Sequence, residues 1–146
     1  MKKYTIYFLS FLCFSFIACS SDDDSCSGKT EAISIEVEGV EMSNITGTAS
    51  INQSLIGINI SGNSTNESEV FFSSPNAVGT YDLNLDFSGE LESRTITAFV
   101  PDGFVNIILS SGCYEVVSID ATDVVMRFNI NENDTSINGE ISLEVN

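Results

Sequence analysis

The chain has 146 residues, of which 21 are acidic and five basic, so its formal net charge is −16 at pH 7. A field of this sign repels the phosphates of nucleic acids and attracts divalent cations or a basic protein, so we expect no nucleic-acid binding. Histidine is absent. This excludes Ser-His and Cys-His catalysis and argues against a structural zinc site, which needs four Cys or His ligands.

Residues 1–18 have the pattern of an export signal. Lys2 and Lys3 form a short positive region, and a mostly apolar run from Tyr4 to Ala18 follows, as in a secretory signal peptide. A transmembrane helix needs roughly 20 apolar residues. This run is shorter and stops close to three aspartates, so the segment predicts export and not a membrane span.

The sequence Phe16-Ile17-Ala18-Cys19 places a small residue directly before a cysteine. It resembles the lipobox of bacterial lipoproteins, in which the cysteine carries acyl chains such as palmitate and becomes the first mature residue. Phe16 stands where that family usually has Leu. The resemblance implies a membrane anchor on Cys19, since each buried methylene contributes about 0.8 kcal/mol. Ordinary cleavage near Ala18, which would leave a free secreted domain, is the alternative.

Ser20, Ser21, Asp22, Asp23 and Asp24 follow the cysteine directly. This run resembles the export signal of Bacteroidota surface lipoproteins, in which Ser and acidic residues after the lipidated Cys mark the protein for the outer face of the outer membrane. The resemblance implies a protein anchored in the outer membrane and facing the cell exterior. The other interpretation is a solvated spacer, because adjacent carboxylates repel one another and keep the chain extended.

We divide the remaining chain into a lipidated cysteine with its acidic tether at 19–30 and a single domain at 31–146, a usual size for one domain. All 21 acidic residues lie beyond the signal with only three cations, so the mature net charge is −18. Two thiols remain, Cys26 and Cys113, and an oxidising compartment favours a disulfide between them. A buried Cys113 with a free Cys26 is the alternative.

Apolar and polar residues alternate with period two over much of the domain, which is the signature of strands with one buried face. The regular runs are 33–37 with 40–42 after a turn at Gly39, 56–60, 81–87, 124–130 and 137–145, and the less regular candidates are 46–51, 69–73, 94–100, 105–110 and 113–119. Turn segments rich in Asn, Ser, Thr and Gly separate them. No stretch has a sustained helical period.

The sequence therefore predicts an all-β domain, a single antiparallel β-sandwich of about eight to ten short strands, with an up-and-down β-barrel as the alternative. The signal, the tether, the strand start Gly79-Thr80-Tyr81 and the segment Ser118 to Asp123 before a closing strand together are similar to small single-domain surface lipoproteins of Bacteroidota. That class is one of unknown function. The resemblance therefore implies a location and no activity.

Two patterns near the end of the chain have both a functional and a structural interpretation. Asn129, Asn131, Asn133 and Glu140 have the spacing of calcium-loop ligands, but such a loop needs Gly at its sixth position and helices on both sides. We predict a polar hairpin loop instead. Asn138-Gly139 fits either a tight turn or the interior of the last strand.

Adjacent Phe71 and Phe72 must point to opposite faces of a strand. We expect a strand covered on both faces, and the alternative is one exposed aromatic anchor. Paired carboxylates are the only catalytic arrangement left open, and 21 acidic residues bring some pair together by chance. We expect a binding or structural interaction module without a cofactor, for an extracellular ligand or a basic protein partner. A carboxylate-dependent hydrolase of surface glycans is the alternative.

Overall fold

The computed structural model describes residues 26, 29–63, 68–85, 95–100 and 105–146. Cys19 and the export run from Ser20 to Asp24 lie outside these residues. The described chain is built of strands, as the sequence predicts. Within it, we find no helix with the length and hydrophobicity that crossing a membrane requires.

Eleven strands make up the described part of the chain. They are β1 (Ser34–Val37), β2 (Val40–Glu41), β3 (Ser43–Ile51), β4 (Leu55–Asn63), β5 (Glu69–Pro75), β6 (Gly79–Asp82), β7 (Ile96–Val100), β8 (Val105–Leu109), β9 (Cys113–Ile119), β10 (Asp123–Glu132) and β11 (Thr135–Val145). The predicted runs correspond to these strands, and β3, β4, β10 and β11 are longer than the sequence indicated.

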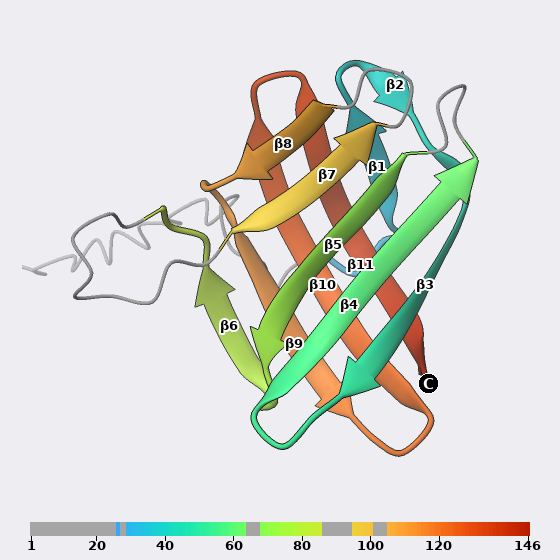
Figure 1. Ribbon diagram of the computed structural model, residues 1–146, viewed down its shortest axis with the longest axis vertical. Coiled ribbons are helices and arrows are strands. Elements are labelled where there is room, and N and C mark those ends of the chain that lie inside the picture. Colours follow the sequence, from blue (N-terminus) through green and yellow to red (C-terminus); the bar gives the residue numbers. More distant parts are fainter. Residues whose placement is uncertain (1–25, 27–28, 64–67, 86–94, 101–104) are drawn as a thin grey trace, which may run out of the picture.

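All eleven strands belong to one hydrogen-bonded sheet in the order β6-β9-β10-β11-β3-β4-β5-β7-β8, with β1 paired to β11 and β2 paired to β1. The sheet curls so that β3, β4, β5, β7 and β8 lie in front of β9, β10 and β11 (Figure 1). The fold is all-β. It has two facing layers, as in a sandwich, but its strands are continuous through one sheet, as in a barrel.

One strand pair departs from the antiparallel arrangement that the sequence predicts. The end of β11 runs parallel to β3, with Glu144 opposite Thr48 and Val145 opposite Ala49. The first part of β11 pairs instead with β1, where Ile137 lies opposite Ile35. Alternation within a strand contains no information about the direction of its neighbour, so the sequence could not show this pair.

The turn between β10 and β11 is a two-residue hairpin at Asn133 and Asp134, as predicted for a polar loop. Gly139 lies inside β11 with φ of +108°, and a Cβ there would come within 2.7 Å of the Glu31 carbonyl oxygen and 2.8 Å of the Ala32 carbonyl oxygen. The glycine lets the chain before β1 cross close to β11. Of the two interpretations of Asn138-Gly139, the strand interior is therefore correct.

The most regular alternating run, 81–87, forms a shorter strand than predicted. β6 ends at Asp82, and all of its residues pair with β9. Beyond that end Leu83 is buried and Leu85 is 43% exposed, and residues 86–87 lie outside the described part. Alternation favours a strand, but a strand also needs a neighbour within hydrogen-bonding reach.

The core lies between the two layers of the curled sheet. The ring of Phe72 on β5 meets the rings of Tyr114 on β9 and Phe128 on β10, with centroids 5.2 Å and 5.9 Å apart and edge-to-face geometry. Such pairs add about 0.5 to 1.5 kcal/mol beyond the area they bury. The inward phase predicted for 124–130 is confirmed, since Val124, Met126, Phe128 and Ile130 are fully buried.

Candidate binding face

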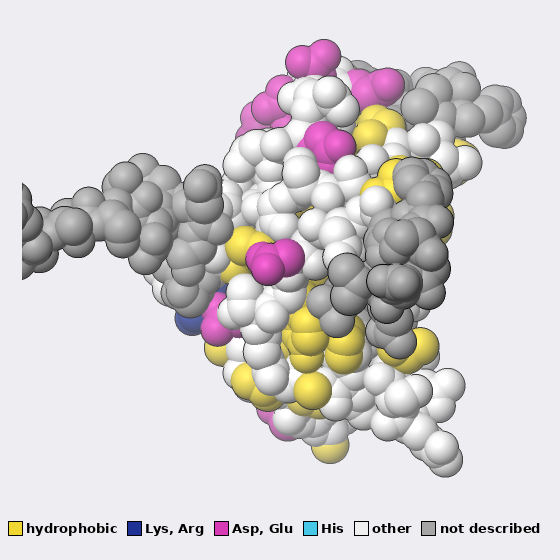
Figure 2. Space-filling model, turned by 90° about the vertical axis from the view of Figure 1, so that its left-hand side faces the viewer, with side chains coloured by type: hydrophobic (Ala, Val, Ile, Leu, Met, Phe, Trp, Pro, Cys, Tyr) yellow, Lys and Arg dark blue, Asp and Glu magenta, His cyan; other side chains and the backbone are white. Residues whose placement is uncertain are grey.

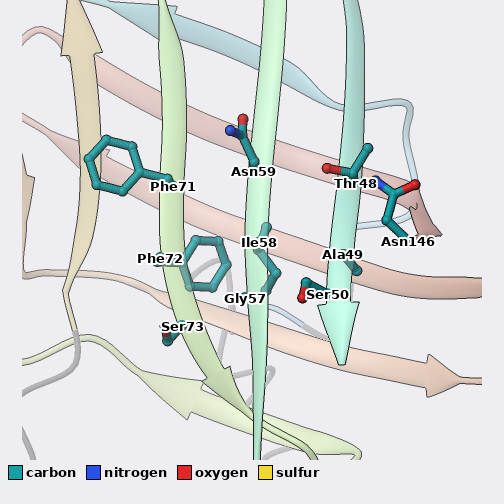
Figure 3. Close-up of a pocket in the computed structure, with 10 residues that line it drawn as sticks. All are labelled: Thr48, Ala49, Ser50, Gly57, Ile58, Asn59, Phe71, Phe72, Ser73 and Asn146. Atoms are coloured by element: carbon teal, nitrogen blue, oxygen red, sulfur yellow. The ribbon is translucent and has the colours of Figure 1, made fainter. Parts of the chain in front are cut away.

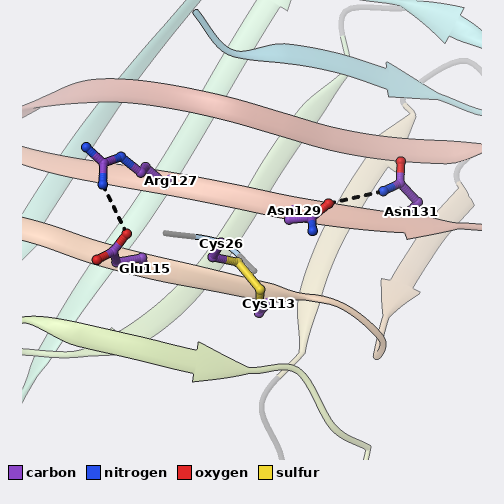
Figure 4. Close-up of a disulfide and its surroundings, with 6 residues drawn as sticks. All are labelled: Cys26, Cys113, Glu115, Arg127, Asn129 and Asn131. Carbon is purple, nitrogen blue, oxygen red and sulfur yellow. Dashed lines mark hydrogen bonds and ion pairs between the residues drawn. A yellow bond between two sulfur atoms is a disulfide. The ribbon is translucent and has the colours of Figure 1, made fainter. Parts of the chain in front are cut away.

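A disulfide joins Cys26 to Cys113 at the start of β9 (Figure 4), with an S–S distance of 2.08 Å and Cα atoms 6.0 Å apart. This Cα separation is one that a disulfide spans. The next residue, Tyr114, points into the core, so the Cys113 side chain points to the outer side of the sheet. Cys26 is fully buried there. The chain that leads from Cys19 is thus fastened to the outer surface of β9.

Arg127 forms ion pairs with both neighbouring strands on the same outer surface. Its Nη1 lies 3.3 Å from Glu115 Oε2 on β9, and its Nε lies 2.8 Å from Glu140 Oε2 on β11. The hydrogen bond to Glu140 and the charges of both carboxylates raise the pKa of the Arg127 guanidinium above its usual value. Both carboxylates are therefore engaged by one cation.

Charge is divided unevenly between two halves of the sheet. In the strands as described, the charged half, which consists of β1, β2, β6, β9, β10 and β11, contains Arg127 and the carboxylates of Glu36, Glu41, Asp82, Glu115, Asp123, Glu132, Glu140 and Glu144. The uncharged half consists of β3, β4, β5, β7 and β8, and Glu69 is the only charged residue in those strands. Figure 2, seen from the side of β6, shows scattered acidic side chains that outnumber the basic ones.

The outward side chains of β3, β4 and β5 form a regular grid on the uncharged half. One row across the strands is Thr48, Asn59 and Phe71, and the next row is Ser50, Gly57 and Ser73. We term these six residues the uncharged face. Thr97 on β7 continues the first row beyond Phe71. Polar neutral groups and one aromatic ring thus lie side by side without a carboxylate among them.

Phe71 is 42% exposed, whereas Phe72 is 8% exposed. The prediction that both faces of this strand are covered is therefore wrong, and the alternative, an exposed aromatic residue, is what the structure shows. Covering Phe71 would need a third layer. The described strands form only two, and β5 lies in the front one (Figure 1).

Gly57 leaves a hollow of about 370 Å³ in the uncharged face (Figure 3). The hollow is lined by all six residues of the face and by Asn146 at its margin. A Cβ at Gly57 would meet nothing closer than the Ser50 carbonyl oxygen at 3.8 Å. The fold therefore does not require glycine at this position, and its effect is to keep the hollow open.

A second hollow of about 240 Å³ lies further along β4, where Thr46, Ser61, Asn63 and Glu69 are among its lining residues. Among the outward residues of β4, Gly57 and Asn59 line the first hollow, and Ser61 and Asn63 line the second. From Gly57 to Asn63 an extended strand covers about 20 Å. The two hollows thus lie in line along β4, and we term this line the β4 furrow.

Two further hollows lie on the charged half. Asp82, Cys113 and Asn129 help to line one of about 350 Å³ beside the disulfide. Glu36 and Asp134 help to line one of about 230 Å³ at the turn between β10 and β11. Among the described residues, no group of three or more Cys, Asp or Glu side chains is placed to hold a metal ion.

Of the predicted site residues, the structure brings Cys26 and Cys113 together, whereas the anchor and export residues lie outside the described part. Sequence reasoning singled out Phe71 but missed Gly57, Asn59 and Thr48. One signal could have found the hollow, because a glycine between Ile56 and Ile58 occupies a solvent-facing position of a regular strand. Comparison of the chain with protein-family profiles, curated proteins and solved structures found no match.

Proposed function

We propose that this protein is a lipoprotein anchored through Cys19 in the outer membrane, facing the cell exterior, whose β domain binds its ligand on the uncharged face. The observation that carries the binding part is the distribution of charge. In the strands that the structure describes, one half carries eight carboxylates, and the other carries only Glu69. Acidic residues on both halves would keep the protein equally soluble. Solubility therefore does not explain why one half is nearly free of charge, whereas binding of a ligand does.

Two further features of the uncharged face support binding because neither one helps folding. Glycine in the middle of a strand costs roughly 0.5 to 1 kcal/mol relative to alanine, and Gly57 has room for a Cβ. Phe71 leaves 42% of its surface in water, although an aromatic ring is most stabilising when it is buried. A hollow beside an exposed ring is the usual form of a small binding site.

The disulfide would give the proposed anchor a defined position relative to this face. Cys26 is seven residues after Cys19, and an extended chain spans at most about 3.6 Å per residue, so the lipid would lie within about 25 Å of Cys26. Cys113 lies on the outer surface of the charged half, and the uncharged face lies on the outer surface of the opposite layer. The membrane would then be on the charged side, and the uncharged face would point to the exterior.

A carboxylate-dependent hydrolase is the rival function and would need two carboxylates that converge on one hollow. Glu36 and Asp134 share the hollow at the turn between β10 and β11, but no aromatic side chain lines it. Glu115 and Glu140 are both engaged by Arg127. The only hollow with an exposed aromatic ring among those described above has no Asp or Glu side chain in its lining, which favours binding over hydrolysis.

Site-specific photo-crosslinking in intact cells tests the binding face without assuming a ligand. A photoreactive amino acid would replace Ser73 on the uncharged face or, as the matched control, Ser118, which is also exposed but lies on β9. We expect a shifted adduct from position 73 and none from position 118. Equal labelling at both positions, or no adduct at position 73, would contradict the proposed face.

Detergent partitioning and protease treatment of intact cells test the anchor and its direction. Cys19→Ala should move the protein from the detergent phase to the aqueous phase. The unchanged protein should be digested from outside, and replacement of Asp22, Asp23 and Asp24 by Ala should protect it. Digestion that is the same in the triple variant would contradict the export role of the acidic run.

A further inference from the structure

We propose further that the ligand is a neutral polysaccharide that lies along the β4 furrow, with one sugar ring stacked on Phe71. This inference rests on the proposed use of the uncharged face and adds the chemistry of the ligand. It follows from three properties of the face: its aromatic ring, its neutral hydrogen-bonding groups and its elongated shape.

The exposed aromatic ring provides a surface on which the flat side of a sugar ring can stack. Phe71 is exposed and lies at the wall of the hollow that Gly57 leaves open. The face of an aromatic ring is electron-rich, so it attracts the weakly positive C–H groups on one side of a pyranose ring. A single ring beside a hollow fits one sugar unit with a substituent directed into the space over Gly57.

The polar groups around the ring are the kind that sugar hydroxyls require. Thr48, Ser50 and Ser73 carry hydroxyls that both donate and accept hydrogen bonds, and Asn59 carries an amide that does the same. None of them is charged. An anionic ligand would find no cation here, and a basic ligand would be better served by the carboxylates of the other half.

The shape of the face favours a chain over a single sugar. The second hollow continues along β4 from the first, with Thr46, Ser61 and one carboxylate, that of Glu69, in its lining. On β4, Gly57 lies at the first hollow and Ser61 at the second, with Asn59 between them and the outward residues of β3 and β5 on either side. A linear polymer can occupy both hollows at once, which a single sugar unit cannot do.

A second copy of this chain is the competing occupant, because two uncharged faces could approach without repulsion. In a two-fold contact, however, the same patch lies on both partners. The Phe71 ring of each copy is then the bulky group available to enter the hollow of the other, and it would leave the hydroxyls of Ser50 and Ser73 without hydrogen-bond partners. The depression at Gly57 therefore favours a convex ligand over a copy of itself.

Affinity electrophoresis of the full chain in detergent tests the proposal, with starch, β-glucan, xylan or mannan in the native gel. We expect at least one of these neutral polysaccharides to retard the protein, and the anionic polymers pectate and alginate to have no effect. Phe71→Ala should weaken the retardation about tenfold or more, and Phe71→Tyr should retain it. Ile108→Ala, which removes an exposed apolar residue of β8 two strands beyond Phe71 and outside the lining of the hollow, is the matched control and should change nothing.

Gly57→Val separates binding from folding. The structure has room for its Cβ, so the variant should unfold at the same temperature or higher while the filled hollow abolishes retardation. Retardation that survives both Gly57→Val and Phe71→Ala would overturn the site. Retardation by none of the four neutral polymers would overturn the ligand class, and a crosslink from position 73 would then still support the binding face. A dimer in sedimentation that Phe71→Ala dissociates would show that a second copy is the occupant and overturn the proposal.

Discussion

The charged and uncharged halves of the sheet share one core but differ in their outer surfaces. Inside, they are equivalent partners: Phe72 of the uncharged half meets Tyr114 and Phe128 of the charged half. Outside, one half carries Glu115, Arg127 and Glu140 in an ion-paired row, and the other carries neutral side chains around an exposed ring. Folding therefore constrains the inner faces of both halves alike, whereas the outer faces are free to differ and can be adapted to a function.

Truncation of the shared core should have the largest effect. Phe128→Ala removes a fully buried ring and should lower the free energy of unfolding by about 3 to 5 kcal/mol. Phe71→Ala, on the outer face, should change it by less than about 1 kcal/mol. Urea denaturation of both variants measures the contrast, and similar losses would mean that the outer face of β5 is not a free surface.

Loss of the disulfide should cause the second-largest loss of stability, and it should affect the charged half of the sheet. The double variant Cys26→Ser with Cys113→Ser opens a loop of 87 residues, and we expect a loss of about 2 to 4 kcal/mol in the free energy of unfolding. Denaturation with and without reductant measures it. The uncharged face should keep its binding in the double variant, and loss of binding there would show that the halves are not independent.

Two glycines on neighbouring strands should respond in opposite directions. A Cβ at Gly47 would strike the buried Leu143 side chain and lie 3.2 Å from the Asn59 carbonyl oxygen, so Gly47→Ala should cost about 1 to 3 kcal/mol. Gly57→Ala has open space and should be neutral or stabilising by up to about 1 kcal/mol. Melting temperatures compare the two directly. Destabilisation by Gly57→Ala would mean that this glycine serves the fold and not the hollow.

A pH effect should come from Glu132, which joins the halves. Its carboxylate accepts hydrogen bonds from the N–H groups of Ser110 at 2.6 Å and Ser111 at 3.1 Å, at the turn between β8 and β9. Burial raises the pKa of Glu132. These two hydrogen bonds and the one from the Ser110 hydroxyl lower it by a larger amount, so the pKa lies below the ordinary value of 4.5. Because the pKa of Glu132 is lower in the folded than in the unfolded protein, its ionised carboxylate stabilises the fold when the pH is above the pKa of the unfolded state. This contribution is lost as the pH falls through the pKa of the folded state.

The matched variant isolates this contribution. Glu132→Gln should cost about 1 kcal/mol at pH 7, and the difference from the unchanged protein should shrink as the pH is lowered below about 4.5. Unfolding free energies at pH 7 and in acid provide the measurement. A difference that stays constant across this range would contradict the role of the ionised carboxylate.

The alternation of side chains could predict most of the strands and their inward residues. Ile35, Ile58 and Phe128 all point into the core as their phase indicated, because a strand with one wet face must alternate. The cysteine count likewise indicated Cys26 and Cys113 as partners. Alternation was less informative at 81–87, where the strand ends at Asp82, because strand length depends on the neighbour and not on the segment alone.

The all-β class, the inward faces and the pair of adjacent aromatics can be recognised without coordinates, and one of these aromatics had to leave the core if only one face was covered. These properties follow from local periodicity and composition. The folded structure is needed to show that Phe71 is the exposed residue and that Thr48, Asn59 and Gly57 lie beside it. It also shows that the end of β11 pairs in parallel with β3 and that the carboxylates of the described strands gather on one half. Neighbours across a sheet are set by strand order and register, which arise from the packing of the whole core and cannot be seen in the sequence of any single strand.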